Sequence, residues 1–189
     1  MNRVIKTFLN GRVNIVVGDI TKEKIDAIVN AANSTLMGGG GVDGAIHQVG
    51  GPKILEECKK LRQTEFTNGL PTGQVAITTG GNLPCKYVIH TVGPIRGKHE
   101  DEEKLLANCY KNSLNIAVEK KITTIAFPSI STGAYGYPLD EAANIASTTI
   151  SDFLKNDNSI KEVRLVFFTH KTAEFFLENE NFNDYDENF

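Results

Sequence analysis

The sequence predicts an α/β protein in which helices cover both faces of a mostly parallel sheet. Short apolar, β-rich runs alternate along the chain with longer segments whose apolar residues have helical spacing, and glycine or proline stands at several of the junctions. Strands that alternate with helices form parallel sheets, because each helix carries the chain back across the sheet. With 189 residues the chain fits one domain. We expect this domain to span residues 1–178 and the acidic tail, residues 179–189, to fray.

The expected strands are apolar and bounded by turn residues, and the expected helices have an apolar face. Strands are predicted at 13–17, 27–31, 74–79, 87–92, 124–130 and 163–168. Helices are predicted after the turn at 18–21, at about 42–49, from Pro52, at 102–119, from Pro138 and around 173–177. Two glycine-containing loops, at 38–41 and 131–136, follow strands, so we expect them side by side at the edge of the sheet where ligands bind.

Composition excludes several classes of protein. The formal net charge is −3 and no basic stripe is present, so we expect no nucleic-acid partner. No run approaches the roughly 20 apolar residues of a membrane span, and the N-terminus lacks the apolar region of a signal peptide, so we expect no membrane partner and a cytoplasmic location. Cys58, Cys85 and Cys109 are odd in number and form no CxxC pair, and we therefore predict structural thiols and no metal site.

The segment from Asn30 to His47 predicts an anion-binding site. Its four glycines, Gly38 to Gly41, allow the backbone to approach a ligand and point several N–H groups at it. The helix that begins just afterwards adds free N–H donors and a positive dipole end. A flexible connector is the alternative for a glycine run, but this one lacks the Ser, Pro and charge of linkers.

Two titratable residues follow these glycines. Asp43 and His47 stand four residues apart and so share one face of the predicted helix. Asp43 is a candidate for orienting or deprotonating a water molecule, provided that burial raises its pKa. A lone histidine one turn into a helix is more often structural, so we expect His47 to have a supporting role. His90, within a strand pattern, is predicted to be structural.

Five motifs stand in order along the chain. They are GDIT at 18–21, NAAN at 30–33, GGGGVDGAIH at 38–47, VIHTVGP at 88–94 and FPSISTGAYGYP at 127–138. In these motifs, from about Val13 to Leu177, the chain resembles the macrodomains, and among them the MacroD-type ADP-ribosyl hydrolases and O-acetyl-ADP-ribose deacetylases. The resemblance implies a three-layer α/β/α sandwich with a mixed, mostly parallel six-stranded sheet, and a cleft that holds ADP-ribose without a cofactor.

The resemblance also implies how the ligand is held. Asp19 would accept a hydrogen bond from the adenine amino group with Ile20 beside it, although an N-cap is an equally common use of such an aspartate. Asn33 would bind the distal ribose, and Asn30, deeper, would organise the loop; for both residues the alternative is backbone capping in a turn. Phe168 would offer the adenine an aromatic face or lie in the core. The residues expected to close on the diphosphate and distal ribose are Gly38, Gly39, Gly40, Gly41, Val42, Asp43, Ser131, Thr132, Gly133, Ala134 and Tyr135.

Two functions fit these expectations. The first is a metal-independent hydrolase that removes mono-ADP-ribose from acidic side chains of proteins and deacetylates O-acetyl-ADP-ribose, with Asp43, Asn33, His47 and Asn30 as its catalytic residues. The second is a module that binds ADP-ribose without turnover, since binding requires no base. A phosphate-processing or RNA-associated enzyme is a more distant alternative, against which the absence of a basic stripe counts.

Overall fold

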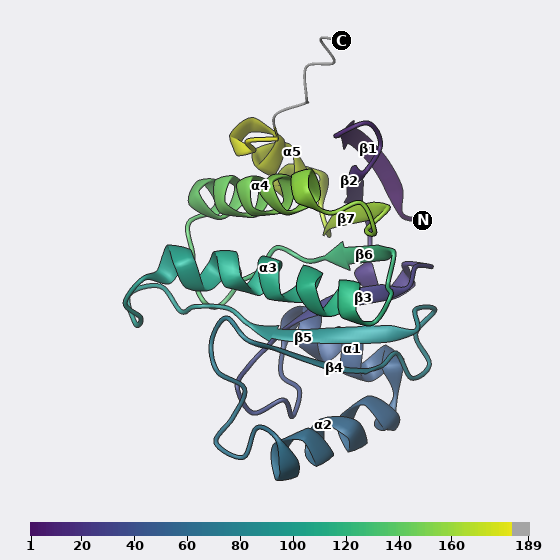
Figure 1. The fold of residues 1–189 in the computed structure, drawn as a ribbon. Helices are drawn as coiled ribbons and strands as arrows, with labels where there is room; N and C mark the ends of the chain where they lie inside the picture. Colours follow the sequence, from purple (N-terminus) through teal and green to yellow (C-terminus); the bar gives the residue numbers. More distant parts are fainter. Residues whose placement is uncertain (183–189) are drawn as a thin grey trace.

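The fold is that of a sheet between two layers of helices, as the sequence predicts (Figure 1). A computed structural model describes residues 1–182 of the chain. Within these residues the sheet has the strand order β1-β2-β7-β6-β3-β5-β4. The five inner strands run parallel, and the outermost strands, β1 and β4, are antiparallel to their neighbours. The sheet is therefore mixed and mostly parallel.

Most elements lie where the sequence predicts them. The strands are β1 (Arg3–Phe8), β2 (Val13–Val17), β3 (Ala27–Ala32), β4 (Val75–Thr79), β5 (Tyr87–Val92), β6 (Thr124–Phe127) and β7 (Glu162–Phe167). The helices are the 3-10 turn η1 (Ile20–Lys22) and α1 (Gly41–Gly50), α2 (Pro52–Thr64), α3 (Glu102–Glu119), α4 (Leu139–Asn156) and α5 (His170–Asn179).

The sheet of the described residues has seven strands, so the expected count of six was wrong. The additional strand is β1, which pairs with β2 at the edge of the sheet. Four of its six residues are exposed and only Phe8 is buried. An edge strand with so little buried surface lacks the apolar alternation by which strands are recognised in a sequence.

Side chains of the inner strands alternate between two cores. Ala27 and Val29 of β3 face the layer of α3, α4 and α5, whereas Ile28 and Ala32 face the layer of α1 and α2. Asn30 has the parity of Ile28 and Ala32, so the pleat directs it toward α1 and α2. The parallel register pairs Asn30 with His90 of β5. Two polar residues of neighbouring strands are thereby buried together under α1 and α2.

The expected C-terminal tail is only partly described. Phe182 is buried, and its ring centroid lies 4.9 Å from that of Phe8. The core thus includes Phe182, four residues beyond the expected end of the domain. Residues 183–189 lie outside the described part of the chain. Among residues 1–182, none of the helices has the length and apolar character to span a membrane.

Candidate functional site

A cleft of about 830 Å³ opens at the carboxyl edge of four adjacent parallel strands. Segments that follow β2, β3, β6 and β7 line it, as expected for a ligand site in a parallel sheet. Fourteen of the predicted residues line the cleft, namely Asp19, Ile20, Asn33, Gly39, Gly40, Gly41, Val42, Asp43, Ser131, Thr132, Gly133, Ala134, Tyr135 and Phe168. The sequence therefore brings two distant loops to one site.

Three predicted residues do not line this cleft: Gly38, Asn30 and His47. Gly38 adopts a φ of +88°, and its carbonyl oxygen accepts a hydrogen bond from the Asn33 side chain at 3.0 Å. Asn30 is fully buried, and the ring of His47 lies 6.2 Å from that of His90 on β5. These three residues support the lining rather than form it.

The glycine loop lies directly on the first turns of α1. A Cβ on Gly44 would stand 2.5 Å from the carbonyl oxygen of Gly39, so only glycine allows this approach. Gly40 is the N-cap of α1 and offers no side chain to cap it. The first N–H groups of a helix have no partner within the helix, and here residues 40–43 at the start of α1 line the cleft. The arrangement favours an anion at the start of α1.

The second loop begins with a strained residue. Ser131 has a φ of +65°, a left-handed conformation that costs free energy in a residue other than glycine. Its Oγ is buried and has no hydrogen-bond partner among the described residues. A Cβ on Gly93 would overlap this oxygen, which explains the glycine of the VIHTVGP motif. Strain and an unpaired hydroxyl at a cleft wall are typical of a ligand-binding position.

Asp19 caps η1 and also lines the cleft. Its Oδ1 accepts hydrogen bonds from the backbone N–H and the hydroxyl of Thr21, at 2.9 and 2.6 Å, and so caps η1. Its Oδ2 lies 3.9 Å from Lys22 Nζ, and the side chain is 34% exposed at the cleft. Because the cap uses one oxygen only, the other remains available to a ligand.

Asn33 organises the glycine loop in this structure. Its Oδ1 accepts a hydrogen bond from the backbone N–H of Thr35 at 3.0 Å, while its Nδ2 donates to the Gly38 carbonyl. The capping alternative therefore describes its contacts, although its side chain also lines the cleft.

Phe168 lies at the rim of the cleft and is 81% exposed, so the core alternative was wrong. Phe175 and Thr172 of α5 line the same rim, and sequence reasoning missed both. Phe175 lies in α5, whereas Phe168 precedes that helix, so no helical spacing links the two residues in the sequence.

Asp43 is the buried acid of the cleft. It is 5% exposed and lies in the first turn of α1. Burial raises the pKa of its carboxyl group, while a hydrogen bond from Asn30 and the nearby His47 oppose that rise. Nδ2 of Asn30 donates to Asp43 Oδ1 at 2.7 Å, and His47 Nε2 lies 3.4 Å from the same oxygen without the geometry of a hydrogen bond. Burial is the environment that a carboxylate needs to act as a base near neutral pH.

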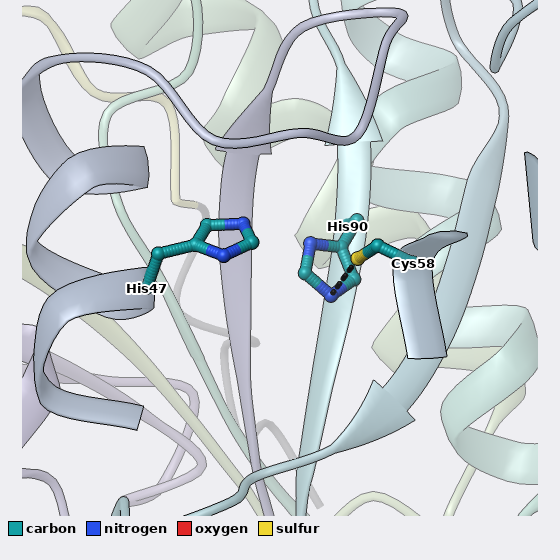
Figure 2. Close-up of side chains that lie close together, drawn as sticks. All are labelled: His47, Cys58 and His90. Atoms are coloured by element: carbon teal, nitrogen blue, oxygen red, sulfur yellow. Dashed lines mark hydrogen bonds between the residues drawn. The ribbon is translucent and has the colours of Figure 1, made fainter. Parts of the chain in front are cut away.

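His47, Cys58 and His90 point toward one another, and Cys58 Sγ lies 3.9 Å from His90 Nε2 (Figure 2). Their donor atoms lie within 4.8 Å of each other, which is compatible with a metal cluster. Both nitrogens of His90 are already engaged, however: Nδ1 contacts Asn30 at 3.1 Å and Nε2 contacts Thr78 at 2.9 Å. Burial also raises the pKa of the Cys58 thiol to about 12, with the charges of Asp43 and Glu57 adding to the rise. A neutral thiol and an occupied imidazole fit metal binding poorly.

Comparison with known proteins identifies the family. The family model for the macro domain matches residues 29–146, and the chain belongs to this family. A macro domain-containing protein of Caldanaerobacter subterraneus is 53% identical, over 87% of this chain and 93% of its own length. The O-acetyl-ADP-ribose deacetylase of Citrobacter koseri is 48% identical, over 89% and 94%. The ADP-ribose glycohydrolase MACROD2 of Xenopus laevis is also 48% identical, over 96% of this chain and 42% of that protein.

Solved structures agree with this assignment. The Oceanobacillus iheyensis macrodomain with ADP has a TM-score of 0.89 and 48% identity, with 95% of each chain covered. The Trypanosoma brucei macrodomain in complex with ADP-ribose has a TM-score of 0.81 and 37% identity, with 90% of this chain and 69% of that chain covered. The expected resemblance to MacroD-type macrodomains is thus confirmed.

Proposed function

We propose that this protein is a hydrolase of ADP-ribose esters, which removes mono-ADP-ribose from acidic side chains of proteins and deacetylates O-acetyl-ADP-ribose. The observation that carries the proposal is the position of Asp43. It is a buried carboxylate that reaches the cleft at the start of α1, next to the glycine loop. Relatives named as a deacetylase and as a glycohydrolase add support.

The cleft suits a dinucleotide-like ligand with a diphosphate at its centre. Among the described lining residues, the charged side chains are Asp19 and Asp43, and none is basic. The negative charge of a diphosphate would therefore be met by backbone N–H groups of the two loops and by the start of α1. We assign the adenine to Asp19 and Phe168, which follow the paired strands β2 and β7. We assign the distal ribose to Asp43, Asn33 and Tyr135, since Asp43 and Asn33 both lie beside Gly39 and Tyr135 lies near enough to Asp43 to interact with it.

The proposed reaction is the hydrolysis of the ester. Asp43 would accept a proton from a water molecule, whose oxygen attacks the acyl carbon or the anomeric carbon of the distal ribose. The ester C–O bond breaks, its electron pair stays on the departing oxygen, and a proton from Asp43 or solvent neutralises this oxygen. A raised pKa makes the carboxylate a stronger base, and Asn30 keeps its Oδ1 oriented.

No step of this proposal uses a metal. We also assign the protein to the cytoplasm, an assignment supported by three free, buried cysteines among the described residues.

The experiment compares wild type with Asp43→Ala on a protein carrying Glu-linked mono-ADP-ribose, with ADP-ribose binding measured by calorimetry. We expect release by the wild type, release near the spontaneous rate by Asp43→Ala, and binding of ADP-ribose by both. Binding by both without release by either would instead assign the chain to the ADP-ribose-binding modules that do not catalyse turnover.

A further inference from the structure

Asp43 is connected to the interior of the fold through a chain of hydrogen bonds. Asn30 Nδ2 contacts both Asp43 Oδ1, at 2.7 Å, and His90 Nδ1, at 3.1 Å. His90 Nε2 contacts Thr78 Oγ1 at 2.9 Å, and Thr78 Oγ1 donates to the carbonyl oxygen of Thr79 at 3.1 Å. Asn30 and His90 are fully buried and Thr78 is 3% exposed. The three residues come from β3, β5 and β4, which are adjacent strands.

The hydrogen bonds that link Thr78, His90, Asn30 and Asp43 have a defined donor and acceptor at each step. A hydroxyl group carries one proton, so when Thr78 gives it to the Thr79 carbonyl, Thr78 Oγ1 accepts a hydrogen bond from His90 Nε2. Cys58 Sγ, 3.9 Å from the same nitrogen, is then a second acceptor. His90 is then the tautomer with hydrogen on Nε2, and the lone pair on Nδ1 accepts from Asn30. Burial and the neighbouring His47 lower the pKa of His90 to about 3, which agrees with a neutral ring.

The donor–acceptor order of these hydrogen bonds determines whether Asn30 turns its NH₂ group or its oxygen toward Asp43. With both amide protons of Asn30 donated, its Oδ1 is buried without a partner among the described residues. A rotated amide would place Oδ1 against the Nδ1 lone pair of His90 and against Asp43 Oδ1, and both contacts would be repulsive with ionised Asp43. The rotated amide becomes favourable only if His90 shifts its proton to Nδ1 and Asp43 is protonated.

We propose that His90, held in one tautomer by Thr78, is a positioning residue that fixes the amide of Asn30 so that Asp43 remains an ionised acceptor facing the cleft. The inference rests on the proposed hydrolase function, because it assigns His90 a part in keeping the base deprotonated. His90 does not line the cleft, so it acts through Asn30 and has no contact with the ligand.

The test uses pairs of variants that differ in one property. Leucine and asparagine have the same branched shape, but only asparagine offers an oxygen near the position of His90 Nδ1, so His90→Asn is the control for His90→Leu. Valine keeps the shape of Thr78 without the hydroxyl, and serine keeps the hydroxyl, so Thr78→Ser is the control for Thr78→Val. Because His90 is buried, the Thr78 pair also provides a test if both His90 variants fail to fold.

The first readout is the titration of the Asp43 carboxyl carbon by NMR, which requires no turnover. The groups that face Asp43 are Asn30, His47 on α1 and Tyr135 in the second loop, with Cys58 on α2 near enough to interact. All four are unchanged in these variants. We expect His90→Leu and Thr78→Val to raise the Asp43 midpoint by about 0.5 pH unit or more, since Asn30 is then free to rotate and accept from protonated Asp43. The controls should stay closer to wild type.

The second readout separates catalysis from binding. We expect kcat to fall about tenfold or more in His90→Leu, with the Kd for ADP-ribose within about threefold of wild type, because a small displacement of a catalytic group impairs chemistry more than binding. His90→Asn should recover part of the loss. A purely structural role would change the members of each pair equally.

The outcomes distinguish this inference from the proposed function. Equal Asp43 midpoints within each folded pair would overturn the positioning role, whatever the turnover. If the wild type shows no turnover but the Asp43 midpoints of His90→Leu and Thr78→Val are still shifted, the positioning role is supported and the hydrolase proposal is overturned.

Discussion

The amide of Asn30 and the carboxylate of Asp43 meet across 2.7 Å behind the floor of the cleft, thirteen residues apart in the chain. Asn30 comes from a central strand and Asp43 from the first turn of α1. Asn30 satisfies one oxygen of Asp43 within the protein. The other oxygen, Oδ2, lies near the glycine loop, 3.2 Å from the place where a Cβ of Gly39 would stand. The acid is therefore held by the core and presented to the loop that would hold the ligand.

The pKa of Asp43 predicts a pH-dependent gain in stability from Asp43→Asn. Burial raises the pKa of this group in the folded state. Its contribution to stability is therefore complete below the ordinary carboxyl pKa and is lost as the pH rises through the raised, folded-state value. At pH 7 the buried charge of Asp43 lowers the free energy of unfolding. Asparagine carries no charge, and its side-chain oxygen still accepts a hydrogen bond from Asn30. We expect the Tm of Asp43→Asn at pH 7 to exceed that of wild type by about 2–4 °C, the shift produced by ~1 kcal/mol in a domain of this size.

Calorimetric Tm values at several pH values check this prediction. The difference between variant and wild type should shrink as the pH falls and should vanish below the ordinary carboxyl pKa. A difference that does not change with pH would contradict the assignment of a raised pKa to Asp43.

Gly44→Ala should destabilise the fold although alanine favours helices. The new Cβ would stand 2.5 Å from the Gly39 carbonyl, and relieving this overlap costs about 1–3 kcal/mol, more than the ~1 kcal/mol that alanine gains in a helix. Gly40→Ala is the control, since it has no neighbour within 4 Å and an extended φ of −94°. Denaturant unfolding measures both, and an equal or higher stability of Gly44→Ala would show that the loop does not pack on α1 as described.

Phe168→Ala should weaken the binding of ADP-ribose without affecting the fold. The ring is 81% exposed and lines the cleft where we propose that the adenine binds, so its removal creates no cavity. Loss of an aromatic stacking contact worth about 0.5–1.5 kcal/mol predicts a Kd about 2- to 12-fold higher. Ribose 5-phosphate lacks the adenine and serves as the control ligand, whose affinity should not change. A parallel loss for both ligands would place the adenine elsewhere.

Removal of metal ions should leave hydrolysis unchanged. The lone pair of His90 that a metal would need is used by Asn30, and its other nitrogen contacts Thr78. We expect the same initial rate before and after dialysis against EDTA, and no gain on addition of Zn²⁺. Loss of activity on chelation and its recovery with Zn²⁺ would instead make His47, Cys58 and His90 a metal centre.

The sequence predicted the fold and most of the cleft because these depend on local patterns. Strand β5 and helix α3 have the predicted bounds, since apolar spacing and flanking glycine or polar residues mark both ends. Strand β1 escaped prediction because it buries little surface. The glycine loops were recognisable because consecutive glycines are rare outside linkers and anion sites.

The partners of Asp43 could not be predicted from local patterns. The pairing of Asn30 with His90 depends on the register between β3 and β5, and the tautomer of His90 depends on a hydroxyl on a third strand. The contacts of Asn33 could not be predicted either. Its hydrogen bonds to Thr35 and Gly38 depend on the path that the glycine loop takes, which the sequence does not show. Contacts between distant segments are set by the packing of the whole sheet, which one sequence does not specify residue by residue.

The central claim is that Asp43 is the base of an ADP-ribose ester hydrolase. The most direct measurement is the initial rate at which Glu-linked mono-ADP-ribose is released at pH 7 by wild type and by Asp43→Asn, at substrate concentrations that saturate both. We expect a rate at least ~100-fold lower for Asp43→Asn, with its fold intact. A folded Asp43→Asn that releases ADP-ribose as fast as wild type would contradict the claim.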